Sequence, residues 1–256
     1  MIRGSSGPAL IVLHELPGLS PDDIALGRRL AGNGFTVYLP LLFGEKNQNR
    51  FAVGYLQSCM TRDFVCSTPS TTSPIVTWVK EVCETIGRRS RGPIGVIGMC
   101  LTGTFPLALL GNTVRAAVLC QPTLPFGLLA AVFGLSERDR HDVGLSQTDL
   151  DSARASDVPL LALRYLDDWR CPNERMKKLQ TLFPGRLAVI EIESRHHPVG
   201  GHHSTLAGDC DRDAFADTVA YLGARLGLAR EARDMRLAKF QDTACRMTAD
   251  GRWETR

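Results

Sequence analysis

Apolar runs alternate with amphipathic stretches along most of this 256-residue chain. Continuous apolar runs rich in β-branched residues are typical of strands buried on both faces. One such run is residues 9–13, and the largely apolar segments 35–39, 94–97, 116–120, 158–165 and 187–192 are predicted as strands too. Helical periodicity and the start signals Ser20-Pro21 and Ser73-Pro74 predict helices between these strands, over 21–31, 74–86, 146–155 and 172–183, and a closing helix after the last strand, over 213–226. This alternation predicts an α/β fold with a mostly parallel central sheet and helices on both faces.

Three segments lack this regularity. Residues 44–72 are irregular and polar, whereas residues 121–145 carry proline and glycine around an apolar stretch, which we expect to act as a lid over the site. After residue 228 the chain is charged and weakly patterned, although residues 235–247 have the pattern of an amphipathic helix. We therefore expect one domain over residues 1–228 and a charged C-terminal helix or tail over residues 229–256.

The segment Ile-Gly-Val-Ile-Gly-Met-Cys-Leu-Thr-Gly, residues 94–103, joins a predicted strand to a helix expected from Leu101. A strand, a sharp turn bearing a nucleophile and a helix form a nucleophile elbow. Gly98 and Gly103 supply the small residues that such a turn needs, while Thr102 stands where a second glycine is usual. The side chain at the turn is Cys100, and a helix N-terminus favours its thiolate. The sequence therefore predicts a thiol nucleophile.

An acid and a histidine are expected later in the chain, each after a strand. Asp167 and Asp168 follow the strand predicted over 158–165, and four of the six histidines follow the strand predicted over 187–192. The histidines could also belong to a polar surface loop or a metal site, but they lack the regular spacing of a helical metal motif. A cysteine–histidine–acid triad explains the order better, and we expect no metal and no cofactor.

Composition narrows the function classes. The eight cysteines are irregularly spaced, without a two-residue pair, which disfavours a disulfide scaffold, a zinc knuckle or a redox motif. The net charge of +3 comes from scattered arginines, so no basic stripe predicts nucleic-acid binding. Neither a signal peptide nor an apolar run of about 20 residues is present, so we expect no membrane partner and a cytoplasmic location.

Four blocks together resemble the dienelactone hydrolase family of α/β-hydrolases: residues 12–19, the elbow at 98–103, Asp168–Pro172 and His203-Ser204. The resemblance implies that Cys100 is the nucleophile, that His203 is the general base and then acid, and that Asp168 orients the imidazole. His202 is the rival of His203 for the base. The implied reaction is hydrolysis of a small ester or lactone, similar to dienelactone (carboxymethylenebutenolide), through an acyl-enzyme.

The same resemblance assigns supporting roles. Glu15 matches a family glutamate that contacts the resting thiol, the amides of Leu16 and Leu101 would form the oxyanion hole, and Arg62 would bind a substrate carboxylate. A small-molecule ester or lactone is then the partner, and the protein is expected to be a monomer or small homo-oligomer. The alternative is a catalytically silent relative that binds a small molecule or a partner, which Thr102, the duplicated histidines and the charged tail favour.

Overall fold

The computed structural model describes residues 2–3, 7–16, 18–43, 72–90, 92–111, 113–124, 136, 140–194, 203–208, 210–228, 246–247 and 253–254. A seven-stranded sheet in the order β1-β3-β2-β4-β5-β6-β7 runs through it. Its strands are β1 (Ile2–Arg3), β2 (Ala9–Leu13), β3 (Thr36–Tyr38), β4 (Ile94–Met99), β5 (Val114–Cys120), β6 (Leu160–Tyr165) and β7 (Leu187–Ile192). The pairs from β3 to β7 are parallel, which confirms the predicted sheet, whereas the unpredicted β1 is antiparallel to β3.

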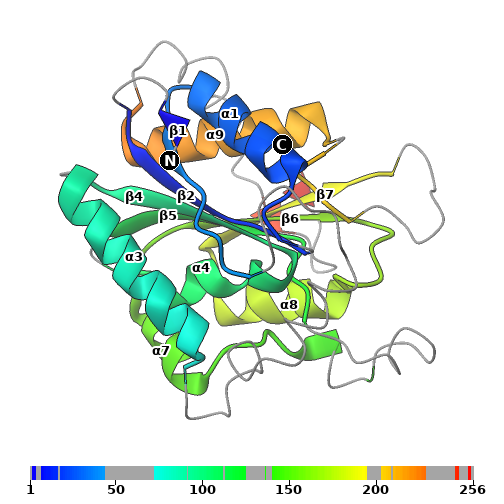
Figure 1. The fold of residues 1–256 in the computed structure, drawn as a ribbon. Coiled ribbons are helices and arrows are strands. Elements are labelled where there is room, and N and C mark those ends of the chain that lie inside the picture. The colour runs from blue at the N-terminus through cyan, green and yellow to red at the C-terminus, as the bar shows by residue number, and fades with distance from the viewer. Residues whose placement is uncertain are drawn as a thin grey trace.

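Helices cover both faces of this sheet (Figure 1). Helices α1 (Pro21–Gly32) and α9 (Arg212–Leu226) lie on one face. Helices α3 (Pro74–Ser90), α4 (Phe105–Ala108), α7 (Gln147–Ala155) and α8 (Asn173–Leu182) lie on the other. Along β2, Leu10 and Val12 pack toward α1 and α9, while Ile11 and Leu13 pack toward α3. Within the described residues, no helix is both long and apolar enough to span a membrane.

The strand register brings the candidate site residues to one edge of the sheet. Leu13 is opposite Gly98, Met99 is opposite Cys120, and Cys120 is opposite Leu163. The segments that follow β2, β4, β5 and β6 therefore emerge side by side at the carboxyl ends of the strands. This is the edge at which open α/β sheets bind their ligands.

One helix prediction was wrong, and a second was wrong in its last two residues. The helix expected from Leu101 is instead the 3₁₀ turn η1 (Cys100–Thr102) followed by the separate helix α4. Pro106 explains the break, because its ring removes the backbone donor and would collide with the carbonyl of Thr102 in a continuous helix. At the C-terminus, Arg246 and Met247 form strand β8, paired with β9 (Trp253–Glu254), and do not continue the helix predicted over residues 235–247.

Other expectations fall wholly or partly outside the described residues. Most of the proposed lid, residues 125–135 and 137–139, belongs to this group, as does the segment between residues 229 and 245. The division into a domain over 1–228 and a tail stays a prediction.

Candidate active site

Cys100 lies at the carboxyl end of β4 in a strained turn. Its φ is 55°, in the left-handed region that residues other than glycine rarely adopt. The turn is tight: a Cβ on Gly98 would lie 2.1 Å from the carbonyl oxygen of Thr102, and one on Gly103 would lie 2.6 Å from Cα of Pro122. Both glycines are therefore required by close backbone approach. The carbonyl of Cys100 accepts hydrogen bonds from the amides of Gly103 at 2.9 Å and Thr123 at 3.0 Å, which fix the turn.

Thr102, the departure from the usual elbow sequence, is fully buried and hydrogen-bonded. Its hydroxyl accepts a hydrogen bond from the Met99 amide at 3.0 Å. The hydroxyl hydrogen faces the carbonyl oxygens of Met99 at 2.9 Å and Leu13 at 3.1 Å. Because Leu13 ends β2, this side chain joins the elbow to the neighbouring strand. The hydroxyl thus has a structural use that a glycine could not supply.

Asp168 follows β6 and meets His203 from the loop after β7. The Nδ1 atom of His203 lies 2.6 Å from Oδ2 of Asp168, whose side chain is fully buried. The other carboxylate oxygen accepts hydrogen bonds from the amide of Arg170 at 3.1 Å and from its Nε at 3.2 Å. Both oxygens are therefore held, and the acid has one fixed orientation. The neighbouring Asp167 instead accepts a hydrogen bond from Ser194.

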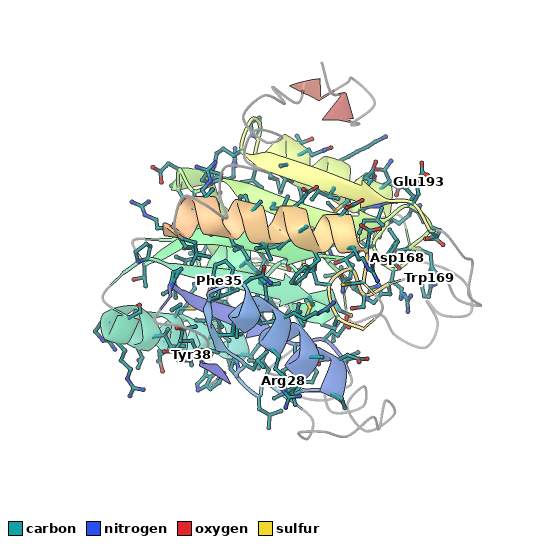
Figure 2. The ribbon with its side chains drawn as sticks, turned by 90° about the horizontal axis from the view of Figure 1, so that it is seen from above. Arg28, Phe35, Tyr38, Asp168, Trp169 and Glu193 are labelled. Atoms are coloured by element: carbon teal, nitrogen blue, oxygen red, sulfur yellow. The ribbon has the colours of Figure 1, made fainter. Side chains whose placement is uncertain are left out.

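Figure 2 shows Asp168 and Trp169 next to one another beyond one end of the sheet, with Glu193 nearby. Trp169 is 44% exposed, in contrast to the buried aspartate beside it. The guanidinium of Arg170 lies 5.9 Å from the Trp169 ring centre, close enough for a cation–π contact. This loop thus presents an aromatic surface at the edge of the sheet where the cysteine lies.

Glu15, Cys100 and His203 come together from three different loops. One donor atom from each of these residues lies within 4.8 Å of those from the other two. Burial of the imidazole disfavours its charge, but Cys100 and Asp168 outweigh this effect and raise the pKa of His203 to about 10. A proton is therefore retained on His203 beside the sulfur. The three donor types are also ones that can bind a metal ion.

Gln121 is a site residue that the sequence analysis missed. It is fully buried directly after β5, with φ at 34°. Its Oε1 accepts hydrogen bonds from the Thr205 amide at 3.2 Å and the Thr205 hydroxyl at 2.5 Å. Because only the oxygen can accept, the NH₂ group faces the other way and donates to Oε2 of Glu15 at 3.1 Å. Gln121 therefore connects Glu15 to the loop that carries His203.

The only signal for Gln121 in the sequence was a polar residue directly after a strand. That position resembles those of Glu15 and Asp168, which also follow strands. Without partners brought from distant loops, this position could not be distinguished from an ordinary loop glutamine.

His14 is close to the site in sequence, yet its bonding is structural. Burial, opposed by a hydrogen bond to the Glu15 carbonyl, lowers the pKa of His14 to about 4, so the ring is neutral. Its Nε2 accepts a hydrogen bond from the Leu42 amide at 2.9 Å. Nδ1 therefore carries the hydrogen and donates to the carbonyl of Glu15 at 3.0 Å. The ring anchors the Glu15 turn to the segment after β3.

The remaining predicted residues fall into two groups. Leu16 lies in the turn after β2, and the buried Leu101 lies in η1 directly after Cys100, so both are at the carboxyl edge of the sheet, and their role as oxyanion donors stays a prediction. Arg62 and His202 lie outside the described residues, and their predicted roles stay predictions.

The comparisons with known proteins agree with this geometry. A candidate dienelactone hydrolase from Klebsiella pneumoniae has a TM-score of 0.59 at 14% identity, with 88% of this chain and 90% of that chain covered. A monoacylglycerol lipase from Paleococcus ferrophilus has a TM-score of 0.53 at 14% identity, with 89% and 97% covered. At these identities the likeness establishes the α/β-hydrolase fold.

None of the curated protein sequences matches the chain. The model of the dienelactone hydrolase family matches residues 3–205, which include β2 to β7 and both Cys100 and His203. The chain therefore belongs to the dienelactone hydrolase family of α/β-hydrolases.

Proposed function

We propose that this protein hydrolyses a small carboxylic ester or lactone, with Cys100 as nucleophile, His203 as base and acid, and Asp168 as its orienter. One observation carries the proposal: His203 lies between a buried carboxylate, 2.6 Å from its Nδ1, and the thiol of an elbow cysteine with φ at 55°. A nucleophile, a base within reach and a group that orients the base are the elements of a catalytic triad. Family membership independently supports a hydrolase.

The reaction begins when the Cys100 thiolate attacks the ester carbonyl and forms a carbon–sulfur bond. The carbonyl oxygen takes the negative charge, and the amides of Leu16 and Leu101 are the proposed donors to it. His203 then gives its proton to the leaving alkoxide as the carbon–oxygen bond breaks, leaving a thioester on Cys100. In a lactone the released hydroxyl stays attached to the acyl group.

Hydrolysis of the thioester uses the same groups in reverse. His203, now neutral, removes a proton from water, and the hydroxide attacks the thioester carbonyl. The carbon–sulfur bond breaks, the acid product leaves, and the sulfur returns to the thiolate with the proton on His203. The raised pKa of His203 supports this cycle, because the resting imidazole holds the proton that the leaving group requires.

Glu15 is the proposed partner of the resting thiol. Its carboxylate lies beside Cys100 and is held by Gln121, so its position is fixed before substrate arrives. We propose that Glu15 accepts the thiol proton when a substrate enters, which leaves the thiolate that attacks the carbonyl, and that it returns this proton to the sulfur when the acid product leaves. We further propose, from the family resemblance, that Arg62 binds a carboxylate on a lactone substrate.

The test is the hydrolysis of p-nitrophenyl acetate by the full-length protein. We expect turnover in the wild type and in Cys210→Ser, which alters a partly exposed thiol elsewhere, and none in Cys100→Ala or after treatment with iodoacetamide. Mass spectrometry of His203→Ala should detect an acetyl group on Cys100. Turnover that persists in Cys100→Ala would refute the thiol mechanism. The absence of both turnover and the acetyl adduct would favour the catalytically silent relative.

A further inference from the structure

Three side chains at the carboxyl edge of the sheet form a donor set for a metal ion, although the proposed hydrolysis uses no metal. Glu15, Cys100 and His203 offer a carboxylate oxygen, a sulfur and an imidazole nitrogen, all within 4.8 Å of one another. We infer that these three residues bind Zn²⁺, and that the bound ion reversibly inhibits the protein. The inhibition rests on the proposed function, whereas the site itself rests on the geometry of the three donors.

The donor chemistry selects the ion. Zinc takes thiolate, imidazole and carboxylate ligands in a tetrahedron with bonds of about 2.0 to 2.3 Å, which places the ligand atoms roughly 3.3 to 3.8 Å apart. The donor atoms of the three side chains already lie within 4.8 Å of one another, so only a small movement of the side chains would bring them to these distances. Magnesium and calcium prefer sites made of oxygen atoms, so a site with sulfur and nitrogen donors favours zinc over both.

The surroundings of the donors also match those of a zinc site. A histidine ligand is commonly oriented by a carboxylate on its other nitrogen, and His203 Nδ1 lies 2.6 Å from Asp168. Its Nε2 is buried and faces the sulfur of Cys100, with no nitrogen or oxygen partner in the part of the chain that the structure describes. Glu15 is held through Oε2 by Gln121 at 3.1 Å. Two of the three ligands therefore already have the outer contacts that hold a ligand in place.

Occupancy by zinc would stop the proposed reaction. The ion would bind the sulfur that attacks the substrate and the imidazole nitrogen that serves as the acid, and the proton on that nitrogen would be released to solvent as zinc binds. Zinc could also bind to a cysteine–histidine pair with two protein ligands, and the third ligand, Glu15, is what distinguishes the site proposed here. A third protein ligand leaves one tetrahedral position for water, as in zinc sites with three protein ligands.

Direct binding tests the site without any substrate. Reduced, metal-free protein is titrated with Zn²⁺ against a chromophoric chelator, and separately with Co²⁺ while the thiolate-to-cobalt absorption is recorded. We expect one tight equivalent in the wild type, loss of that equivalent in Cys100→Ser, and an affinity weakened about tenfold or more in Glu15→Gln and Asp168→Asn. Glu193→Gln and Cys210→Ser are the matched controls, since they change an exposed carboxylate and a thiol outside the donor set.

The outcomes separate this inference from the proposed function. Equal zinc affinity in the wild type, Cys100→Ser and Glu15→Gln would overturn the site, whatever the activity. Zinc binding that needs Cys100 and Glu15, in a protein that hydrolyses no ester, would support the site and contradict the hydrolase. In an active protein, turnover should be lost with Zn²⁺, unaffected by Mg²⁺ and restored by a chelator, and activity that survives saturating Zn²⁺ would refute the inhibition.

Discussion

Asp23 should make this protein less stable as the pH rises from about 4 toward 7. Its carboxylate is fully buried in the first turn of α1, and Oδ2 accepts hydrogen bonds from the amide and hydroxyl of Ser20 at 2.8 and 2.7 Å. The other oxygen is buried without a hydrogen-bond partner in the part of the chain that the structure describes. Burial, partly offset by Ser20 and reinforced by the negative charge of Glu15, raises the pKa of Asp23 from 3.8 to about 7.

The sign and size of the effect follow from linkage. An acid with a raised pKa in the folded state binds more protons there than in the unfolded state, so its contribution is greatest below pH 3.8 and is lost as the pH rises to about 7. A shift of about three units corresponds to about 4 kcal/mol. Between pH 5 and pH 8, the unfolding free energy of the wild type should fall by about 3 kcal/mol relative to a protein with a neutral residue at this position.

The assay compares the wild type with Asp23→Asn, which resembles the protonated carboxyl in shape and charge. Urea unfolding is measured at each pH from 5 to 8, and the difference between the two proteins removes the contribution of all other titrating groups. Asp213→Asn is the control, because Asp213 is an exposed carboxylate in the first turn of α9 and is not among the charges that shift the pKa of Asp23, so its difference from the wild type should not follow this trend.

A flat difference between the wild type and Asp23→Asn would refute the reasoning. It would mean that the Ser20 hydrogen bonds and the positive end of the helix stabilise the carboxylate as strongly as burial disfavours it. A difference that rises with pH would refute it more strongly, because the carboxylate would then be stabilising the fold.

Three further substitutions test the elbow and its surroundings. Thr102→Val should lower the unfolding free energy by about 1 to 3 kcal/mol, since it leaves the buried Met99 amide without a partner. Thermal denaturation measures this loss. An unchanged midpoint in Thr102→Val, or an equal loss in Thr102→Ser, would contradict the role of the hydroxyl. Gly103→Ala should prevent stable folding, because its Cβ would lie 2.6 Å from Pro122 and 2.9 Å from two carbonyl oxygens. Gly111→Ala is the control and should be neutral, because its Cβ meets nothing within 4 Å. Circular dichroism distinguishes the two variants, and a native spectrum for Gly103→Ala would show that the turn is looser than described. Gln121→Leu should lower kcat/KM about ten- to a hundredfold, the loss of about 1.5 to 3 kcal/mol expected for a hydrogen bond to a charged group, while unaltered kinetics in a folded Gln121→Leu would exclude a role in positioning Glu15.

The strands and the elbow could be predicted from the sequence because their signals are local. A buried parallel strand must be apolar on both faces, so a run such as residues 94–99 can be recognised as a strand without knowing which strands lie beside it. The failed helix after Cys100 also had a local signal in Pro106, which should have limited the predicted helix. Strand β1 is two residues long, too short to carry a periodic pattern.

Long-range contacts account for what the sequence could not supply. Gln121 acquires its place from Glu15, 106 residues earlier, and from Thr205, 84 residues later. Choosing Asp168 over Asp167 from the residues alone was equally impossible, because both follow the same strand. The family resemblance favoured Asp168, and the structure places this residue against His203 while Asp167 contacts Ser194.

The contacts of Gln121 indicate that Glu15 and His203 are held as one unit. The amide group of Gln121 can satisfy Glu15 and Thr205 together only in one orientation, because Thr205 supplies two donors and Glu15 an acceptor. A shift of the loop after β7 would therefore displace the imidazole of His203 and, through Thr205 and Gln121, would also disturb the hydrogen bond that holds Glu15. The thiol is fixed separately, by the elbow and Thr102, on a strand between the two. Such a site has a rigid thiol flanked by a carboxylate and an imidazole whose positions are coupled, so a ligand that displaces Glu15 would also act on His203.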